Sequence, residues 1–274
     1  MTDRLPLGEP RVHELGRRGG PTLVLLHGLS DSGLCWPDAV RRWHHTFRII
    51  APDARGHGQS PRFDPTTSGS NRFEDMVADV VALLEALADK GGQPPLLVGH
   101  SMGAGVAGAV LSTRPDLVCA GVLEDPPWYT GSWPQDRPNT TQQNVQPFRD
   151  DLEAALARGR AEHPLWPEIE LRPWAVSKAR FDPSLKDRDQ IASPRPWVQD
   201  AAAITVPALV ITGDRESAVI VTAQSRHRLA DLGNPLIEIR VVPGTGHTVR
   251  RDSPALYHQI VDPWITEHVA TAAG

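Results

Sequence analysis

The stretch from Leu96 to Gly105 constrains this chain more than any other. An apolar run ending in Val98 leads into Gly99-His100-Ser101-Met102-Gly103, and small residues follow. The pattern Gly-x-Ser-x-Gly between a strand-like run and a helix is typical of a nucleophile elbow, a tight turn that holds a serine hydroxyl above the edge of a sheet. Glycines suit such a turn because it leaves no room for side chains. We therefore predict a strand, this turn and a helix, with Ser101 as the nucleophile.

Apolar runs of strand length recur along the chain and alternate with stretches of helical spacing. Continuous apolar runs are typical of strands buried on both faces, and Arg11 to Leu15 suggests a short edge strand. The alternation predicts an α/β fold with a mostly parallel, doubly wound sheet. The runs are Thr22 to Leu26, Phe47 to Ala51, Leu96 to Val98, Val118 to Leu123, Pro207 to Thr212 and Leu236 to Val242.

The alternation of strands and helices stops between Trp128 and Ala203, where only helical segments such as Pro147 to Arg160 and Pro167 to Arg180 are predicted. We interpret residues 128–203 as an inserted helical lid, and residues 1–127 and 204–274 as the core domain. The lid holds five of the eight tryptophans: Trp128, Trp133, Trp166, Trp174 and Trp197. Indoles supply large, flat contact areas for an apolar or aromatic substrate group. The alternative is that they fill a small core within the lid.

Composition limits the possible partners. The 274-residue chain is 40% hydrophobic with a formal net charge of -5, which gives no long-range attraction to nucleic acid or anionic lipid. No apolar run reaches 18 residues and the N-terminus has no leader-like pattern, so we expect a cytoplasmic protein without membrane contact. The two cysteines, Cys35 and Cys119, lack metal-ligand spacing and read as packing residues. We expect no metal and no cofactor, and oligomeric state is left open.

A serine nucleophile needs a base and a carboxylate that orients it. His247 fits the base, because Gly244-Thr245-Gly246 forms a turn directly after the last predicted strand. The order serine before histidine is the one found in this type of sheet. The backbone N–H groups of Met102, after the nucleophile, and Leu29, after His27-Gly28, are the expected oxyanion donors. The other histidines fit structural roles better.

The carboxylate has two possible origins. One is the loop Gly213-Asp214-Arg215-Glu216, after the strand Pro207 to Thr212. The other is Asp125, at the end of the strand that follows the elbow helix, with Glu124 beside it. Either strand end can approach an imidazole at the carboxyl edge of a parallel sheet, so both remain open on this reasoning.

The order of these motifs resembles the α/β-hydrolase superfamily over about residues 10–127 and 204–270. The matching features are His27-Gly28 with Trp36, Asp53-x-Arg55-Gly56-His57-Gly58-x-Ser60, Gly99-x-Ser101-x-Gly103, Gly213-Asp214 and Gly244-x-Gly246-His247. The predicted lid carries no signature of this kind. The resemblance implies an α/β-hydrolase fold and a Ser-His-acid triad.

The resemblance also bears on the acid. In many members it lies at the position that Glu216 holds here, but the following loop lacks the usual proline and is short. When this loop is aligned with the family from its C-terminal end, the position of the acid falls on Ala218, which has no carboxylate. In a minority of relatives, such as haloalkane dehalogenases and zearalenone-type lactonases, the acid lies 24 residues after the nucleophile, as Asp125 does here. We therefore favour Asp125, with Glu216 or Asp214 as alternatives.

The expected function is hydrolysis of a carboxylic ester or lactone with an apolar or aromatic group. Ser101 argues against haloalkane dehalogenases and epoxide hydrolases, which need an aspartate at that position. A carbon–carbon bond hydrolase acting on diketone-type substrates is an alternative, in which the lid arginines Arg172, Arg180 and Arg195 would bind a carboxylate. A second alternative is a receptor without catalysis, because a fold alone does not imply activity.

Overall fold

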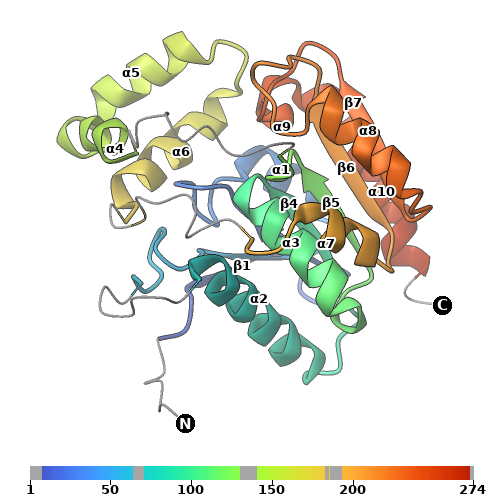
Figure 1. Ribbon diagram of the computed structural model, residues 1–274. Coiled ribbons are helices and arrows are strands. Elements are labelled where there is room, and N and C mark those ends of the chain that lie inside the picture. The colour runs from blue at the N-terminus through green and yellow to red at the C-terminus, as the bar shows by residue number, and fades with distance from the viewer. Residues whose placement is uncertain (1–7, 64–70, 130–140, 183–184, 186–192, 272–274) are drawn as a thin grey trace.

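A single seven-stranded sheet organises the protein, for which a computed structural model describes residues 8–63, 71–129, 141–182, 185 and 193–271 (Figure 1). The strands are β1 (Val12–Gly16), β2 (Thr22–Leu26), β3 (Arg48–Pro52), β4 (Leu96–His100), β5 (Ala120–Glu124), β6 (Ala208–Gly213) and β7 (Ile237–Val242). Their order is β1-β3-β2-β4-β5-β6-β7, and only β1 runs antiparallel to its neighbour. The predicted mostly parallel sheet is confirmed.

Helices connect the strands and cover both faces of the sheet (Figure 1). They are α1 (Pro37–Trp43), α2 (Arg72–Ala88), α3 (Met102–Thr113), α4 (Thr141–Asp150), α5 (Leu152–Glu162), α6 (Glu168–Arg180), α7 (Trp197–Ala203), α8 (Ala223–Leu232), α9 (Val249–Asp252) and α10 (Pro254–Thr271), with the short 3₁₀ helix η1 (Pro115–Leu117).

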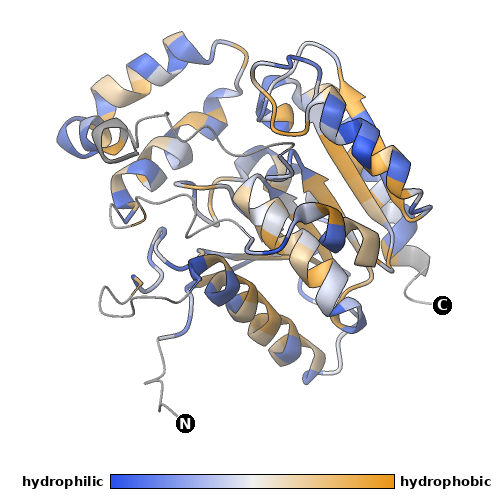
Figure 2. Ribbon diagram, in the orientation of Figure 1, coloured by the Kyte–Doolittle hydropathy of each residue, from blue (hydrophilic) through white to orange (hydrophobic). Residues whose placement is uncertain are grey.

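Successive strand residues point to opposite faces, so the sheet has two separate hydrophobic layers. Val24 and Leu97 belong to the layer that packs against α2, α3 and α8, whereas Leu23 and Leu96 belong to the layer under α1 and α10. Figure 2 shows β6 as hydrophobic along its length, while the outer helix α8 alternates between hydrophilic and hydrophobic residues. Burial on both faces explains the continuous apolar runs in the sequence.

Helix α2 begins where the sequence predicts a cap. The Asn71 side chain accepts a hydrogen bond from the backbone N–H of Phe73 at 3.0 Å, which satisfies one of the free donors at the start of the helix. Its buried face consists of Phe73, Met76, Val80 and Leu84. The cap and the apolar stripe together fix where this helix starts and which side faces the sheet.

The prediction of one helix from Pro147 to Arg160 was wrong, because two helices share that stretch. Asp151 has an extended backbone (φ -150°, ψ 100°) and its side chain accepts a hydrogen bond from the Ala154 N–H at 3.0 Å. It therefore caps α5 and separates it from α4. Helices α4, α5 and α6 enclose a small hydrophobic cluster of their own that includes Phe148 and Trp174. We call these three helices the α4–α6 layer.

The tryptophans of residues 128–203 divide between two places. Trp174 and Trp166 belong to the cluster inside the α4–α6 layer. Trp128 and Trp197 stack on each other at 5.4 Å between ring centroids and belong to the main core, where α7 packs against α3. Trp133 lies outside the described residues. The four described indoles therefore serve as packing groups, and the lid with its boundaries 128–203 stays a prediction.

Candidate active site

Ser101 occupies the tight turn between β4 and α3. Its backbone has φ 51° and ψ -118°, in a region that non-glycine residues adopt only under constraint. A Cβ atom at Gly99 would collide with Ala104, and one at Gly103 would collide with the backbone of Leu26. The two glycines therefore let the helix start directly against the sheet. The turn leaves Ser101 partly exposed although the residues around it are buried.

His247 and Asp125 meet at the carboxyl edge of the sheet. His247 Nδ1 lies 2.5 Å from Asp125 Oδ2, and the Asp125 side chain is completely buried. Asp125 also has a left-handed backbone, with φ 43°, because the chain turns sharply out of β5 at this point. About a third of the His247 side chain is exposed (34%), so its ring is held from one side and open on the other.

Three further donors hold the Asp125 carboxylate. Oδ1 accepts hydrogen bonds from the Thr212 hydroxyl at 2.7 Å and the Val221 N–H at 2.9 Å, and Oδ2 accepts one from the Ile220 N–H at 2.9 Å. Thr212 lies in β6, and the two amides come from the short loop that follows β6. A buried carboxylate needs such partners to remain in the core. Asp125 is therefore fixed in one orientation toward His247.

The two alternative acids lie elsewhere. Glu216 is exposed, caps α8 by accepting the Ala223 N–H at 3.0 Å, and pairs with Arg226 at 2.8 Å. These two bonds lower the pKa of Glu216. Asp214 is exposed and accepts the Gly244 N–H at 2.8 Å. The structure thus brings Asp125 to His247, while the loop that carries Glu216 contributes only its amides.

The expected oxyanion donors lie beside the elbow. Met102 is the first residue of α3, where backbone N–H groups have no carbonyl partner within the helix. Gly28, next to Leu29, packs so closely that a Cβ atom there would lie 3.4 Å from Ser101 Cβ and 2.7 Å from His100 Nδ1. The loop that carries Leu29 therefore lies directly against the nucleophile turn.

His100 connects the serine turn to the histidine turn. Its Nε2 lies 3.1 Å from the carbonyl oxygen of His247, and the two rings are 4.8 Å apart. Burial holds the pKa of His100 well below its usual value, so the ring is neutral and Nε2 donates to that carbonyl. Within the described residues the Ser101 hydroxyl forms no hydrogen bond with His247, a geometry that is common before substrate binds.

His27 and His57 hold the loops below the site. His27 Nδ1 lies 2.8 Å from the Gly28 carbonyl oxygen, and its Nε2 accepts the Ala54 N–H at 2.9 Å. His57 Nδ1 lies 3.0 Å from the Arg55 carbonyl oxygen. Burial lowers the pKa of both rings. These contacts fit the structural roles expected for the two histidines.

Six charged side chains form a cluster behind the site, which we call the ion cluster. Its members come from the loop after β2, from β5, from α6 and from α9: Asp31, Glu124, Glu170, Lys178, Arg250 and Arg251. Five of them are buried and Lys178 is partly buried. No motif in the sequence indicated this cluster, although two arginines three and four residues after His247, in a turn that must pack, are an unusual feature.

Glu170 and Asp31 bridge the cluster. Glu170 Oε2, from α6, lies 2.8 Å from Arg250 Nη1 and 3.0 Å from Arg251 Nε. Asp31 accepts from Arg251 Nη2 at 2.9 Å and pairs with Lys178 at 3.3 Å. Burial alone would raise the pKa of both carboxyl groups, but the neighbouring cations outweigh it and lower their pKa. The helix α6 is thereby tied to the turn after His247 and to the loop after Leu29.

Glu124 differs from the other acids of the cluster. Its Oε1 accepts the Arg250 N–H at 2.8 Å, while Oε2 is 3.4 Å from Arg250 Nε and has no hydrogen-bond partner. Burial raises the pKa of Glu124 to about 7, against the opposing effect of Arg250. This carboxyl group, directly before Asp125, therefore titrates near neutral pH.

The remaining candidates for ligand binding lie on the surface. Arg172 is 67% exposed and pairs with Glu153 at 3.4 Å, and Arg195 pairs with Asp200 at 3.2 Å. Arg180 is exposed as well. In the part of the chain that is described, no three His, Cys, Asp or Glu side chains are grouped to hold a metal ion. None of the described helices has the length and apolar character needed to cross a bilayer.

A mostly parallel sheet, a serine turn after its central strand and a histidine turn after its last strand define a hydrolase-type α/β protein. The chain belongs to the α/β-hydrolase family, whose model matches residues 23–260.

Among curated proteins, the 2-(acetamidomethylene)succinate hydrolase of Mesorhizobium japonicum is 29% identical over 272 residues, covering 93% of this chain and 92% of that protein. The lipase LipV of Mycobacterium tuberculosis is 38% identical over 117 residues, which cover 42% of this chain and only 41% of the lipase.

Among solved structures, an E-2-(acetamidomethylene)succinate hydrolase has a TM-score of 0.69 and 25% identity, covering 93% of this chain and 94% of that one. Est816, described as degrading N-acyl homoserine lactones, has a TM-score of 0.65 and 26% identity, covering 93% and 96%. Both are similar to this chain over nearly its whole length.

Proposed function

We propose that the protein is a serine hydrolase that cleaves a carboxylic ester or lactone through an acyl-enzyme. The contact between His247 Nδ1 and the buried Asp125 carboxylate, beside an elbow serine, carries this proposal. A carboxylate on Nδ1 fixes the imidazole tautomer that leaves Nε2 free to accept a proton, and it stabilises the imidazolium that forms. Family membership and the Mesorhizobium hydrolase support hydrolysis in general, and the lactone-degrading Est816 supports a lactone as one type of substrate.

In the first half-reaction, Ser101 Oγ attacks the carbonyl carbon of the substrate and its proton passes to His247 Nε2. The carbonyl oxygen becomes an oxyanion, which the N–H groups of Leu29 and Met102 stabilise. The bond from the carbonyl carbon to the alcohol oxygen then breaks, and the alcohol takes the proton from His247. With a lactone, this alcohol remains part of the acyl group. Loss of one oxyanion donor typically costs on the order of 10²–10³ in turnover.

In the second half-reaction, His247 takes a proton from a water molecule, whose oxygen attacks the acyl carbon. The second tetrahedral intermediate collapses when its bond to Ser101 Oγ breaks, and Ser101 recovers the proton from His247. The carboxylic acid leaves. Asp125 stays ionised throughout and keeps the ring in place.

The carbon–carbon hydrolase alternative gains no support from the described site. Its carboxylate-binding arginines would be Arg172, Arg180 and Arg195, and these lie exposed, two of them paired with acids. The receptor alternative differs from the proposal in reactivity, because a receptor needs no activated serine.

The test combines a fluorophosphonate probe with hydrolysis of p-nitrophenyl butyrate. The wild-type protein should be labelled and release nitrophenol, and Ser101→Ala should abolish labelling and lower turnover by about 10⁴-fold or more. Ser112→Ala is the matched control, because Ser112 lies in α3 and its hydroxyl donates to the Ala109 carbonyl. A wild-type protein that is neither labelled nor active, or a fully active Ser101→Ala variant, would overturn the proposal.

A further inference from the structure

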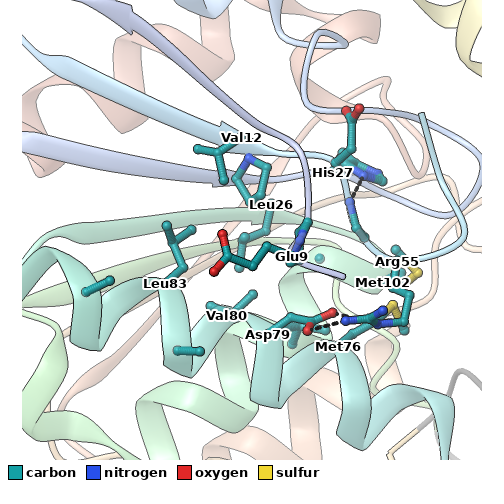
Figure 3. Close-up of a pocket in the computed structure, with 18 residues that line it drawn as sticks. Glu9, Val12, Leu26, His27, Arg55, Met76, Asp79, Val80, Leu83 and Met102 are labelled. Atoms are coloured by element: carbon teal, nitrogen blue, oxygen red, sulfur yellow. Dashed lines mark hydrogen bonds and ion pairs between the residues drawn. The ribbon is translucent and has the colours of Figure 1, made fainter. Parts of the chain in front are cut away.

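A cavity of about 350 Å³ lies between the sheet and helices α2 and α3 (Figure 3). Its volume lies within the range of small-molecule sites. Its described lining comes from the segment before and within β1, the ends of β2 and β3, one side of α2 and the start of α3. None of these lining residues belongs to residues 128–203, so the cavity is separate from the predicted lid.

The cavity is long. Met76, Val80, Leu83 and Ala86 line it at spacings of three and four residues, which places them on one face of α2. Ten residues of helix extend about 15 Å. Ala82 and Ala86, toward the C-terminal end of α2, are exposed. At the other end, Met102 and Gly103 belong to the nucleophile turn. The cavity therefore runs from the surface toward the elbow.

The walls favour an uncharged chain. Most lining side chains are hydrocarbon, among them Val12, Leu26 and Val106. Among the described lining residues the one cation is Arg55, which is already paired with Asp79 through bonds of 2.7 and 3.0 Å. Figure 3 shows this pair at the cavity wall. Glu9 and Asp53 add two more carboxylates. A free carboxylate would be repelled here, whereas an alkyl chain would bury apolar surface.

We propose that this cavity receives a linear, uncharged acyl chain of the substrate. The inference rests on the proposed ester or lactone hydrolysis and names the acyl group that the enzyme takes. Met102 belongs to both sites, because its N–H is an expected oxyanion donor and its residue lines the inner end of the cavity. A methionine side chain adapts its shape readily, so it can move aside as the chain enters beside the carbonyl carbon bound at Ser101.

The experiment compares kcat/KM for p-nitrophenyl acetate and p-nitrophenyl decanoate. Ala82→Trp fills the outer end of the cavity from an exposed position, which avoids disturbing the core. It should lower the decanoate-to-acetate ratio at least about tenfold, because the chain loses its burial. Ala78→Trp is the matched control, since Ala78 is an exposed alanine of the same helix outside the cavity lining. It should leave the ratio unchanged.

The outcomes separate the two proposals. If esters are hydrolysed and Ala82→Trp keeps the wild-type ratio, the chain site is wrong and the hydrolase proposal stands. If neither hydrolysis nor labelling occurs, calorimetric binding of octan-1-ol still tests the cavity. Binding that is at least tenfold weaker in Ala82→Trp than in Ala78→Trp supports an uncharged chain there. Equal binding, no binding, or tighter binding of octanoate than of octan-1-ol overturns the inference.

Discussion

At the scale of single residues, the contact between Asp125 and His247 makes a direct prediction. Asp125→Asn keeps the size of the side chain but removes the charge that stabilises the imidazolium, so kcat should fall about 10³–10⁴-fold. Glu216→Gln should stay within twofold of wild type, because Glu216 only pairs with Arg226 and caps α8. Steady-state hydrolysis of p-nitrophenyl butyrate measures both. A crippled Glu216→Gln variant beside an active Asp125→Asn variant would reverse the assignment of the acid.

Glu124 predicts a dependence of stability on pH. Its pKa of about 7 in the folded protein lies above the ordinary glutamate value of 4.5, so the folded state holds a proton that the unfolded chain releases. The free energy of unfolding should therefore decrease between about pH 4.5 and pH 7, by up to about 3 kcal/mol from this group. Glu124→Gln should flatten this part of the curve in urea unfolding, whereas Glu238→Gln, on the exposed edge strand β7, should not. Parallel curves for wild type and Glu124→Gln would contradict the prediction.

Strand-end positions predicted His247 and the loops of Leu29 and Met102 as neighbours, and they left Asp125 and the loop of Glu216 as two possible acids. The family resemblance then favoured Asp125. Parallel strands end at the same edge of a sheet, so linear position there implies proximity. The ion cluster escaped prediction for the opposite reason. Glu170 and Asp31 contact Arg251 only after three separate segments pack together. Charge pairing of that kind produces no regular spacing of residues in the sequence, so no pattern predicts it.

At the scale of elements, the boundaries that local chemistry determines were predictable. The Asn71 cap set the start of α2, and apolar runs gave the strands within one or two residues. The break between α4 and α5 was missed because an aspartate such as Asp151 can either cap a helix or occupy an exposed helical position. Only its extended backbone in the structure shows that it caps α5. The position of α7 against α3 was missed as well, since it depends on the stacking of Trp197 on Trp128.

Element packing also explains why the carboxylate beside His247 comes from the end of β5 rather than from the loop after β6. That loop is short and folds back, so its Ile220 and Val221 amides reach the carboxylate of Asp125. Its own acid, Glu216, instead points to the start of α8. The short loop thus supplies donors to an acid on the neighbouring strand, which is the arrangement that the lack of the usual proline suggested.

At the scale of the whole molecule, the α4–α6 layer is joined to the sheet chiefly through α6. The layer has its own small hydrophobic cluster, and Glu170 and Lys178 of α6 reach the ion cluster beside the site. A layer with few buried contacts to the main core is expected to open before the sheet does. The fold of the core was predictable from its alternating pattern, but this attachment was not, because it depends on buried charges.

We therefore predict that the α4–α6 layer exchanges its amide hydrogens through a separate opening. In hydrogen exchange followed by mass spectrometry, peptides of α5 should exchange faster than those of β4 and β5.

Glu170→Gln removes the acid that pairs with Arg250 and Arg251, and breaking such a buried pair costs on the order of 3 kcal/mol. It should speed exchange in α5 and α6 and lower kcat, because the turn after His247 loses its anchor. Glu168→Gln, two residues earlier, is the control, since its pairing with Arg160 is exposed and worth little. Exchange in α5 as slow as in β4 would show that the layer and the sheet open together. Equal effects of the two substitutions would show that the pairs of Glu170 do not anchor the layer.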